Sequence, residues 1–176
     1  KNIRDLCGKP LLFWTLDALH KARRVSRVVV DTDDDTIAEL VAELHPQTTI
    51  LRRPDHLLGG HITGNPLTEW EMTQVEGEHF LQTHVTNPLI TPATIDAAVD
   101  KYFAALEVSH DSLFSVTEHH FRLFDAAGRP LNHNPAELIR SQDLDPIYED
   151  NSCLYVFSRT SFTRNGGRAG RWPQMF

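Results

Sequence analysis

Three polar turns, each directly after a short apolar run, carry the side chains best suited to binding chemistry. They are Asp31–Asp33, Arg52–Asp55 and Gln82–Asn87. Cationic, amide and hydroxyl groups together suit a sugar or a nucleotide better than an apolar ligand. In open α/β sheets, ligands bind beyond the carboxyl ends of the strands. We therefore expect the three turns to converge on one polar crevice.

Each of these features also has a purely structural interpretation. Asp33 could equally cap the helix that follows it, and Arg52 and Arg53 could be solvated surface charges. The adjacent His119 and His120 invite a metal site, but neighbours on a strand point to opposite faces and make a poor chelate. The sequence holds no Cys/His ligand set, Gly-x-Ser-x-Gly elbow, Walker loop or complete Gly-x-Gly-x-x-Gly. The residues alone predict a crevice for a sugar or phosphorylated ligand.

Strand and helix patterns alternate along most of the chain, which predicts an α/β fold with a mostly parallel sheet. Apolar residues at helical spacing predict helices over residues 10–23, 34–44, 67–75 and 91–106. Short apolar runs predict strands over 28–30, 49–51, 79–82, 112–117 and 154–157. Phe121–Leu131, with a turn at Asp125–Gly128, is typical of a hairpin arm. Residues 53–66 and 164–171 are predicted to be loops.

Composition narrows the class of protein. The 176 residues fit a single domain, and 17 Lys and Arg against 24 Asp and Glu give a formal net charge of −7. That acidic balance disfavours a nucleic-acid partner, and no apolar run approaches the ~20 residues of a membrane span. The isolated Cys7 and Cys153 suit a reducing compartment such as the cytoplasm better than a disulfide scaffold. The first residue is not Met, so we expect a fragment.

Six stretches, in order over nearly the whole chain, resemble the acylneuraminate cytidylyltransferase family, the CMP-sialic acid synthetases. They are Lys1–Leu11, Asp31–Asp34, Arg53–Leu57, Leu81–Leu89, Ser115–His120 and Arg140–Tyr155. Any one of them is weak, but their common order makes the resemblance specific. It implies a three-layer αβα Rossmann-like nucleotidyltransferase domain over residues 1–176. It also implies a projecting arm at about residues 119–150 that makes a homodimer.

The resemblance implies an enzyme that joins CTP to a nonulosonic, sialic-acid-like sugar and releases pyrophosphate. Mg²⁺ would neutralise the phosphates. By the same resemblance, Lys1, Asn2 and Arg53 lie at the nucleotide. Gln82, Thr86, Asn87, Arg140, Gln142 and Tyr148 would hold the sugar, the last three across a dimer. An Arg suits the sugar carboxylate because its planar fork can bind two oxygens. No catalytic side chain or metal ligand is assigned.

The sequence also departs from the family pattern. The family's Gly-rich loop would lie before Lys1 and its Asp-x-Asp segment after Phe176, so both terminal segments are expected to be missing. Gly60 stands where the family often has Asp, and Ile90 where it usually has Arg. These changes leave open a relative of sialic acid, such as legionaminic or pseudaminic acid. Two alternatives are a CMP-KDO synthetase-like enzyme and a non-catalytic nucleotide- or sugar-binding remnant.

Overall fold

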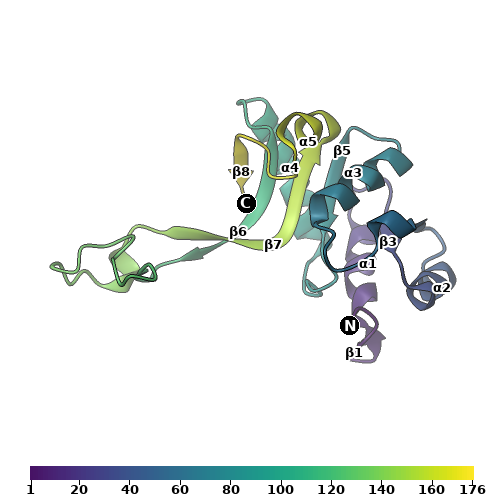
Figure 1. Cartoon of the computed structure of the whole chain (residues 1–176), viewed down its shortest axis with the longest axis horizontal. Helices are drawn as coiled ribbons and strands as arrows, with labels where there is room; N and C mark the ends of the chain where they lie inside the picture. The colour runs from purple at the N-terminus through teal and green to yellow at the C-terminus, as the bar shows by residue number, and fades with distance from the viewer.

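The computed structural model describes residues 1–176, with five α-helices and eight strands (Figure 1). The helices are α1 (Leu11–Lys21), α2 (Asp35–Leu44), α3 (Gly64–Gln74), α4 (Pro92–Leu106) and α5 (Arg159–Asn165). The strands are β1 (Asp5–Leu6), β2 (Lys9–Pro10), β3 (Val29–Thr32), β4 (Thr49–Arg52), β5 (His79–Thr83), β6 (Ser112–His119), β7 (Ile147–Ser158) and β8 (Pro173–Met175). The predicted alternation of strands and helices is confirmed.

The sheet is built in two parts. Four strands pair in the order β5–β7–β6–β8, while β3 and β4 form a separate parallel pair. Strand β7 is antiparallel to both of its neighbours, and β8 is parallel to β6. Strands β5, β6 and β8 therefore run in one direction, with β7 the exception to the mostly parallel arrangement.

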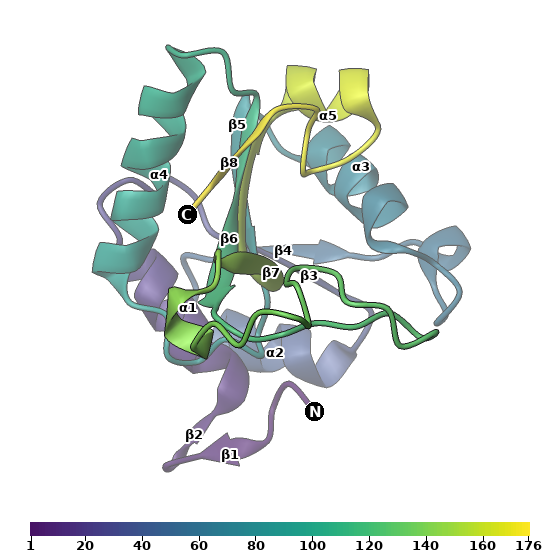
Figure 2. The ribbon, with the colours of Figure 1, turned by 90° about the vertical axis from the view of Figure 1, so that its left-hand side faces the viewer.

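Helices cover both faces of the four-stranded sheet, which gives three layers. Alternate side chains of β7 point to opposite faces. Leu154 and Val156 join a buried cluster with α4, whereas Tyr155 and Phe157 join one with α3 and α5. The helix residues in these clusters are Ala98 and Tyr102 of α4, Met72 of α3 and Phe162 of α5. Figure 2 shows α4 on one side of these strands and α3 and α5 on the other.

Local side-chain caps define where three helices begin. The Asp34 carboxylate accepts from the backbone N–H of Ile37 at 3.2 Å and starts α2. Thr91 caps α4 and Ser158 caps α5 in the same way. The capping alternative raised for Asp33 is therefore wrong by one residue, because Asp34 takes that role.

The C-terminal region differs most from the sequence-based prediction. Residues 164–171 were expected to form a loop, but α5 extends through Asn165 and ends at Gly166 in the left-handed conformation, with φ of 72°. Strand β8 then adds to the sheet beside β6. Strand β8 has three residues and the β1–β2 hairpin two per strand. Elements that short carry no periodic signal.

An arm extends from the body along β6 and β7. Their pairing continues to His119 and Ile147, and the chain between them folds into loops at the tip. A turn there is closed by hydrogen bonds from the Arg129 and Ala127 backbone N–H groups to the Asp125 carboxylate, both 2.9 Å. Figure 1 shows this arm projecting well clear of the helices. Dimerisation through it stays a prediction.

Candidate functional site

A cavity of about 730 Å³ lies between β3 and β5. Residues 28–31 line one wall and residues 79–85 the other, and the rest of the lining comes from α1, α3, α4, β7, the segments 24–27 and 75–78, Arg53 and Arg168. Strand β3 pairs only with β4, and β5 pairs only with β7. Each of the two strands therefore has one edge whose backbone groups make no ladder hydrogen bonds. The cavity is thus the space between two unpaired strand edges, and its apolar lining includes the core residues Leu12, Leu16 and Val28.

Two of the three polar turns meet at this cavity through Asp31 and Arg53. The Arg53 Nε and Nη2 atoms donate to Asp31 Oδ2 at 3.0 and 2.7 Å. Arg53 Nη1 also lies 3.9 Å from Asp33 Oδ1. The hydrogen bond to Asp31 raises the pKa of Arg53 above its usual value, so the guanidinium stays charged. Arg53 is an ordered, mostly buried group, whereas Arg52 is exposed and pairs with Asp35.

Glu71 of α3 brings a second carboxyl group to the same end of the cavity. Burial raises the pKa of Glu71 to about 7. The Asp31 charge and a hydrogen bond shared with Asp31 add to the rise, while the Arg53 charge opposes it. Near neutral pH, Glu71 therefore holds a proton part of the time and can share it with Asp31. Asp31, Glu71 and Arg53 are termed the Asp31 cluster below.

The third turn reaches the cavity through Gln82, whose amide is held at both ends. Its Nε2 donates to Thr68 Oγ1 at 3.1 Å, and its Oε1 accepts from Arg168 Nη1 at 2.7 Å. The Arg168 guanidinium carbon lies 3.6 Å from the centroid of the Tyr155 ring. The Tyr155 hydroxyl donates to the Asp150 carboxylate at 2.7 Å. Gln82, Arg168 and Tyr155 are termed the Arg168 cluster below.

His84 lies beside the Arg168 cluster. Burial lowers the pKa of His84, the positive charge of Arg168 lowers it further, and Asp150 opposes both. His84 is therefore uncharged at neutral pH. The neighbouring Thr83 has a buried hydroxyl with no hydrogen-bond partner. Arg168 is consequently the cation of this end of the cavity.

The other predicted residues of the nucleotide and sugar sites lie outside the cavity lining. The Lys1 and Asn2 carbonyls accept from the backbone N–H groups of Arg4 and Leu12, which holds the segment before α1 in place. Thr86 is exposed, and the Asn87 amide donates to the Ser152 carbonyl at 3.4 Å. Only Gln82 of the third turn's predicted residues faces the cavity.

The three remaining predicted sugar residues lie on the arm. Arg140 pairs with Asp143 at 2.6 Å, and the Tyr148 hydroxyl donates to Glu118 at 3.2 Å. Gln142 is exposed in a short 3-10 helix. A single chain does not bring these three to Gln82. Their assignment to the sugar stays a prediction that depends on a second copy.

Three cavity residues were missed from the sequence. Thr68 and Glu71 are three positions apart in α3, so they share a helix face that points to the predicted crevice. That spacing, on a helix next to the turns, could have identified them. Arg168 carries no such signal, because its place depends on contacts with β5 and β7 that lie far away in the sequence.

The residues present do not form a metal site. No group of three or more His, Cys, Asp or Glu side chains is arranged to hold an ion. His119 instead pairs with Glu149 at 2.8 Å, and His120 with Glu118 at 3.0 Å. The Asp31 carboxylate already forms an ion pair with Arg53. Mg²⁺ therefore remains an expectation from the family resemblance.

The three layers, with polar side chains following β3, β4 and β5, define the class of protein as a Rossmann-like α/β domain. The structure is similar to that of a CMP:2-keto-3-deoxy-manno-octonic acid synthetase complexed with CTP. The TM-score is 0.66 at 13% identity, over 94% of this chain and 71% of that one. It is also similar to a 4-diphosphocytidyl-2C-methyl-D-erythritol synthase from Anaerococcus prevotii, with a TM-score of 0.62 at 12% identity, over 90% of this chain and 65% of that one.

The chain belongs to the cytidylyltransferase family, whose model matches residues 1–166. It is 28% identical over 179 residues to an N-acylneuraminate cytidylyltransferase of Oncorhynchus mykiss, covering 98% of this chain and 40% of the relative. It is 25% identical to one of Streptococcus agalactiae, covering 93% of this chain and 41% of that protein. The chain thus spans about two fifths of the length of these curated relatives. The resemblance read from the six motifs is confirmed.

Proposed function

We propose that this chain is the nucleotide- and acceptor-binding part of a cytidylyltransferase that joins CTP to a nonulosonic, sialic-acid-like sugar acid. The products would be the CMP-sugar and pyrophosphate. The observation that carries the proposal is that Arg53 and Gln82, each from a different predicted subsite, meet the same face of α3, Arg53 beside Glu71 and Gln82 in a hydrogen bond with Thr68. The similarity to N-acylneuraminate cytidylyltransferases supports the choice of acceptor.

The contribution of the chain to such a reaction is positioning and electrostatics. The acceptor hydroxyl attacks the α-phosphate, so the reaction needs no side-chain nucleophile. Asp31 holds Arg53 by two hydrogen bonds, which fixes the remaining guanidinium donors for a nucleotide. Thr68 and Arg168 fix the Gln82 amide, which leaves it no rotational freedom to lose when a sugar binds.

The proposal includes Mg²⁺, a homodimer and a cytoplasmic location. Mg²⁺ is the proposed cofactor of the complete reaction, and chelation with EDTA is expected to stop pyrophosphate release. Exposed apolar side chains on the arm support a partner subunit; they are Phe121, Phe124, Leu131 and Leu138. Cys7 and Cys153 are both free thiols, in keeping with a reducing compartment. No helix is long and apolar enough to cross a membrane.

A second candidate acceptor is an eight-carbon keto-deoxy sugar acid. The chain is 34% identical to a 3-deoxy-manno-octulosonate cytidylyltransferase of Chlorobaculum tepidum, over 58% of this chain and 39% of that protein. The matches to N-acylneuraminate enzymes extend over 93% or more of the chain and include the arm. The nonulosonic acid is therefore the first choice.

The test is pyrophosphate release by the natural full-length protein with CTP, Mg²⁺ and a panel of sugar acids. The panel contains N-acetylneuraminic, legionaminic, pseudaminic and 3-deoxy-manno-octulosonic acids. Release with one of the first three supports the proposal, and release with the last alone favours the second candidate. Binding of CTP without product from any acid would leave only a non-catalytic nucleotide-binding role.

A further inference from the structure

Arg168 differs from the other arginines that line the cavity. Arg24 pairs with Asp100 at 2.7 Å, and Arg53 pairs with Asp31. Arg27 is exposed and lies before β3 begins. Arg168 is half-buried, has no carboxylate within ion-pair distance and makes one hydrogen bond, to the neutral Gln82 amide. The remaining guanidinium N–H donors are therefore free for a ligand.

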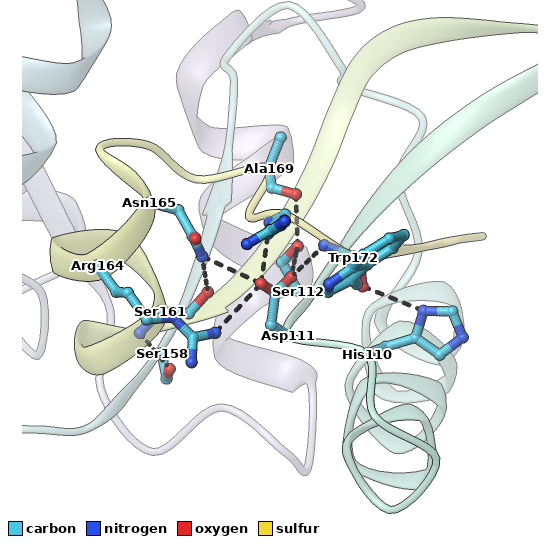
Figure 3. Close-up of polar contacts among 10 residues, drawn as sticks. His110, Asp111, Ser112, Ser158, Ser161, Arg164, Asn165, Ala169 and Trp172 are labelled. Carbon is cyan, nitrogen blue, oxygen red and sulfur yellow. Dashed lines mark hydrogen bonds and ion pairs between the residues drawn. The ribbon is translucent and has the colours of Figure 1, made fainter.

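Residues on both sides of Arg168 are anchored to the start of β6, and Figure 3 shows the bonds that Asp111 and Ser112 make to Asn165, Ala169 and Trp172. Asp111, at the start of β6, accepts from the backbone N–H groups of Arg171 and Trp172 at 2.9 and 3.0 Å. The Asp111 carboxylate also accepts from the Asn165 amide at 3.0 Å. The Ser112 hydroxyl donates to the Ala169 carbonyl at 2.6 Å. The bonds hold the chain immediately before and after Arg168.

The same anchor constrains the backbone at Gly170. Its φ of +64° lies in the left-handed region, and a Cβ there would overlap Asp111 Oδ1 and Ser112 Oγ. Only glycine allows the segment to approach Asp111 this closely. Burial alone would raise the pKa of Asp111, but the hydrogen bonds outweigh it and hold the pKa below its usual value. The anchor is therefore a charged carboxylate at neutral pH.

The side chain of Arg168 is fixed as well as its backbone. Its guanidinium lies flat enough on the Tyr155 ring to bring the central carbon within 3.6 Å of the centroid. Tyr155 is itself held by its hydroxyl bond to Asp150, and Gln82 is held by Thr68. A cation that is stacked and already oriented loses little conformational entropy on binding an anion.

The two clusters, which meet α3 one helical turn apart at Glu71 and Thr68, differ in charge. Asp31, Asp33 and Glu71 gather around Arg53 and neutralise it. In the Arg168 cluster, Arg168 has no carboxylate within ion-pair distance, the Asp150 carboxylate binds the Tyr155 hydroxyl, and His84 is uncharged. An anionic group is therefore bound more favourably beside Arg168 than beside the Asp31 cluster. The flat fork of a guanidinium suits a planar carboxylate, which it can bind through two oxygens.

From these contacts we infer that Arg168 is a specificity-determining residue of the acceptor site, where its guanidinium binds the carboxylate of the sugar acid. Tyr155, Gln82 and Asp111 are its positioning residues. The inference rests on the proposed function, because the acid is the acceptor of that reaction. It assigns the carboxylate to a residue of the same chain as the cavity, in place of Arg140 on the arm.

The test is isothermal titration of the full-length protein with the sugar acids of the panel above, each as the free acid and as its methyl ester, and with CTP. Arg168→Gln is expected to weaken binding of the acid by about 10–100-fold, as loss of a charge-assisted pair does. The methyl ester is expected to bind the wild-type protein as weakly as the acid binds the variant. Arg168→Lys keeps the charge but not the fork, and is expected to fall between the two.

Arg171→Gln is the matched control, because it removes the same charge from the same segment while keeping the backbone N–H that binds Asp111. It is expected to bind the acid as the wild type does. CTP is expected to bind equally to wild type and Arg168→Gln, and a loss confined to CTP would assign Arg168 to a phosphate and overturn the inference.

The outcomes separate the inference from the proposed function. If the protein makes product but Arg168→Gln binds the acid normally, the inference is wrong and the function stands. If Arg140→Gln alone weakens the acid, the carboxylate belongs to the arm, and the inference is again wrong. If the wild type binds CTP but no acid of the panel, the proposed acceptor fails and the inference fails with it.

Discussion

The Asp31 cluster and the Arg168 cluster use an arginine in opposite ways. In the Asp31 cluster the arginine is bound by one carboxylate and lies near two more, so its positive charge is compensated. In the Arg168 cluster the arginine is held by an amide and an aromatic ring, which fix its position without cancelling its charge. Counting cations in a sequence therefore does not locate an anion site. Their partners decide which cation remains available.

The largest expected effect tests the Asp31 cluster. Arg53→Gln leaves the Asp31 carboxylate, whose side chain is 8% exposed, beside Glu71 without a cation. Removing one partner of a buried pair costs about 3 kcal/mol of unfolding free energy at pH 7. Urea denaturation measures it. Arg52→Gln is the control, because the exposed Arg52–Asp35 pair contributes at most about 0.5 kcal/mol. Equal effects of the two variants would show that Asp31 does not depend on Arg53.

The next prediction concerns the proton held by Glu71. Because folding raises the pKa of Glu71 from 4.5 to about 7, this group destabilises the folded protein progressively as the pH rises through that range. Glu71→Gln is expected to stabilise the protein by up to about 3 kcal/mol at pH 8, at about 1.36 kcal/mol per pKa unit. The gain should disappear below about pH 4.5. Thermal unfolding of both proteins from pH 4 to 8 measures this gain in stability. A stability difference between variant and wild type that does not change with pH would contradict the prediction.

A smaller effect is expected at the anchor of the Arg168 segment. Asp111→Asn keeps the shape but loses the charged acceptor, at a cost of about 2 kcal/mol at pH 7. Since folding lowers the pKa of Asp111, its contribution is present above the usual value of 3.8 and is lost as the pH falls below it. Amide exchange at Arg171 and Trp172 should rise in the variant. Asp125→Asn, in the exposed turn of the arm, should leave those amides protected.

Much of the fold could be predicted from local sequence, because its causes are local. Asp34 and Thr91 start α2 and α4 through bonds to residues three positions on. The meeting of Asp31 and Arg53 follows from strand direction alone, since β3 and β4 are parallel and both turns leave the same edge. The family motifs then indicate which ligands, a nucleotide and a sugar acid, are expected at these turns. These are the parts of the molecule that the sequence predicts correctly.

The Arg168 cluster could not be predicted, because its causes are distant in sequence. Asp111 binds Arg171 and Trp172 across 60 and 61 residues, and Gln82 binds Arg168 across 86. Nothing in residues 164–171 indicates which arginine turns inward, since Arg164 and Arg171 have similar neighbours. The register of the assembled β-sheet decides which arginine turns inward. A basic segment predicted to be a loop thus becomes part of the site only after the sheet is assembled.

The smallest predicted effect separates the ring of Tyr155 from its hydroxyl. Tyr155→Phe removes the bond to Asp150 but keeps the face on which Arg168 stacks, so stability should fall by about 1 kcal/mol. Binding of the sugar acid should stay within about threefold, because the cation still rests on an aromatic ring. Tyr155→Leu removes the ring as well and should weaken the acid much more than CTP. Urea denaturation measures the stability of both variants, and titration with the sugar acid and with CTP measures their binding. If the two variants lose acid binding equally, the hydroxyl and Asp150 orient Arg168 rather than the stack. The arginines of both clusters would then be held in place by a carboxylate.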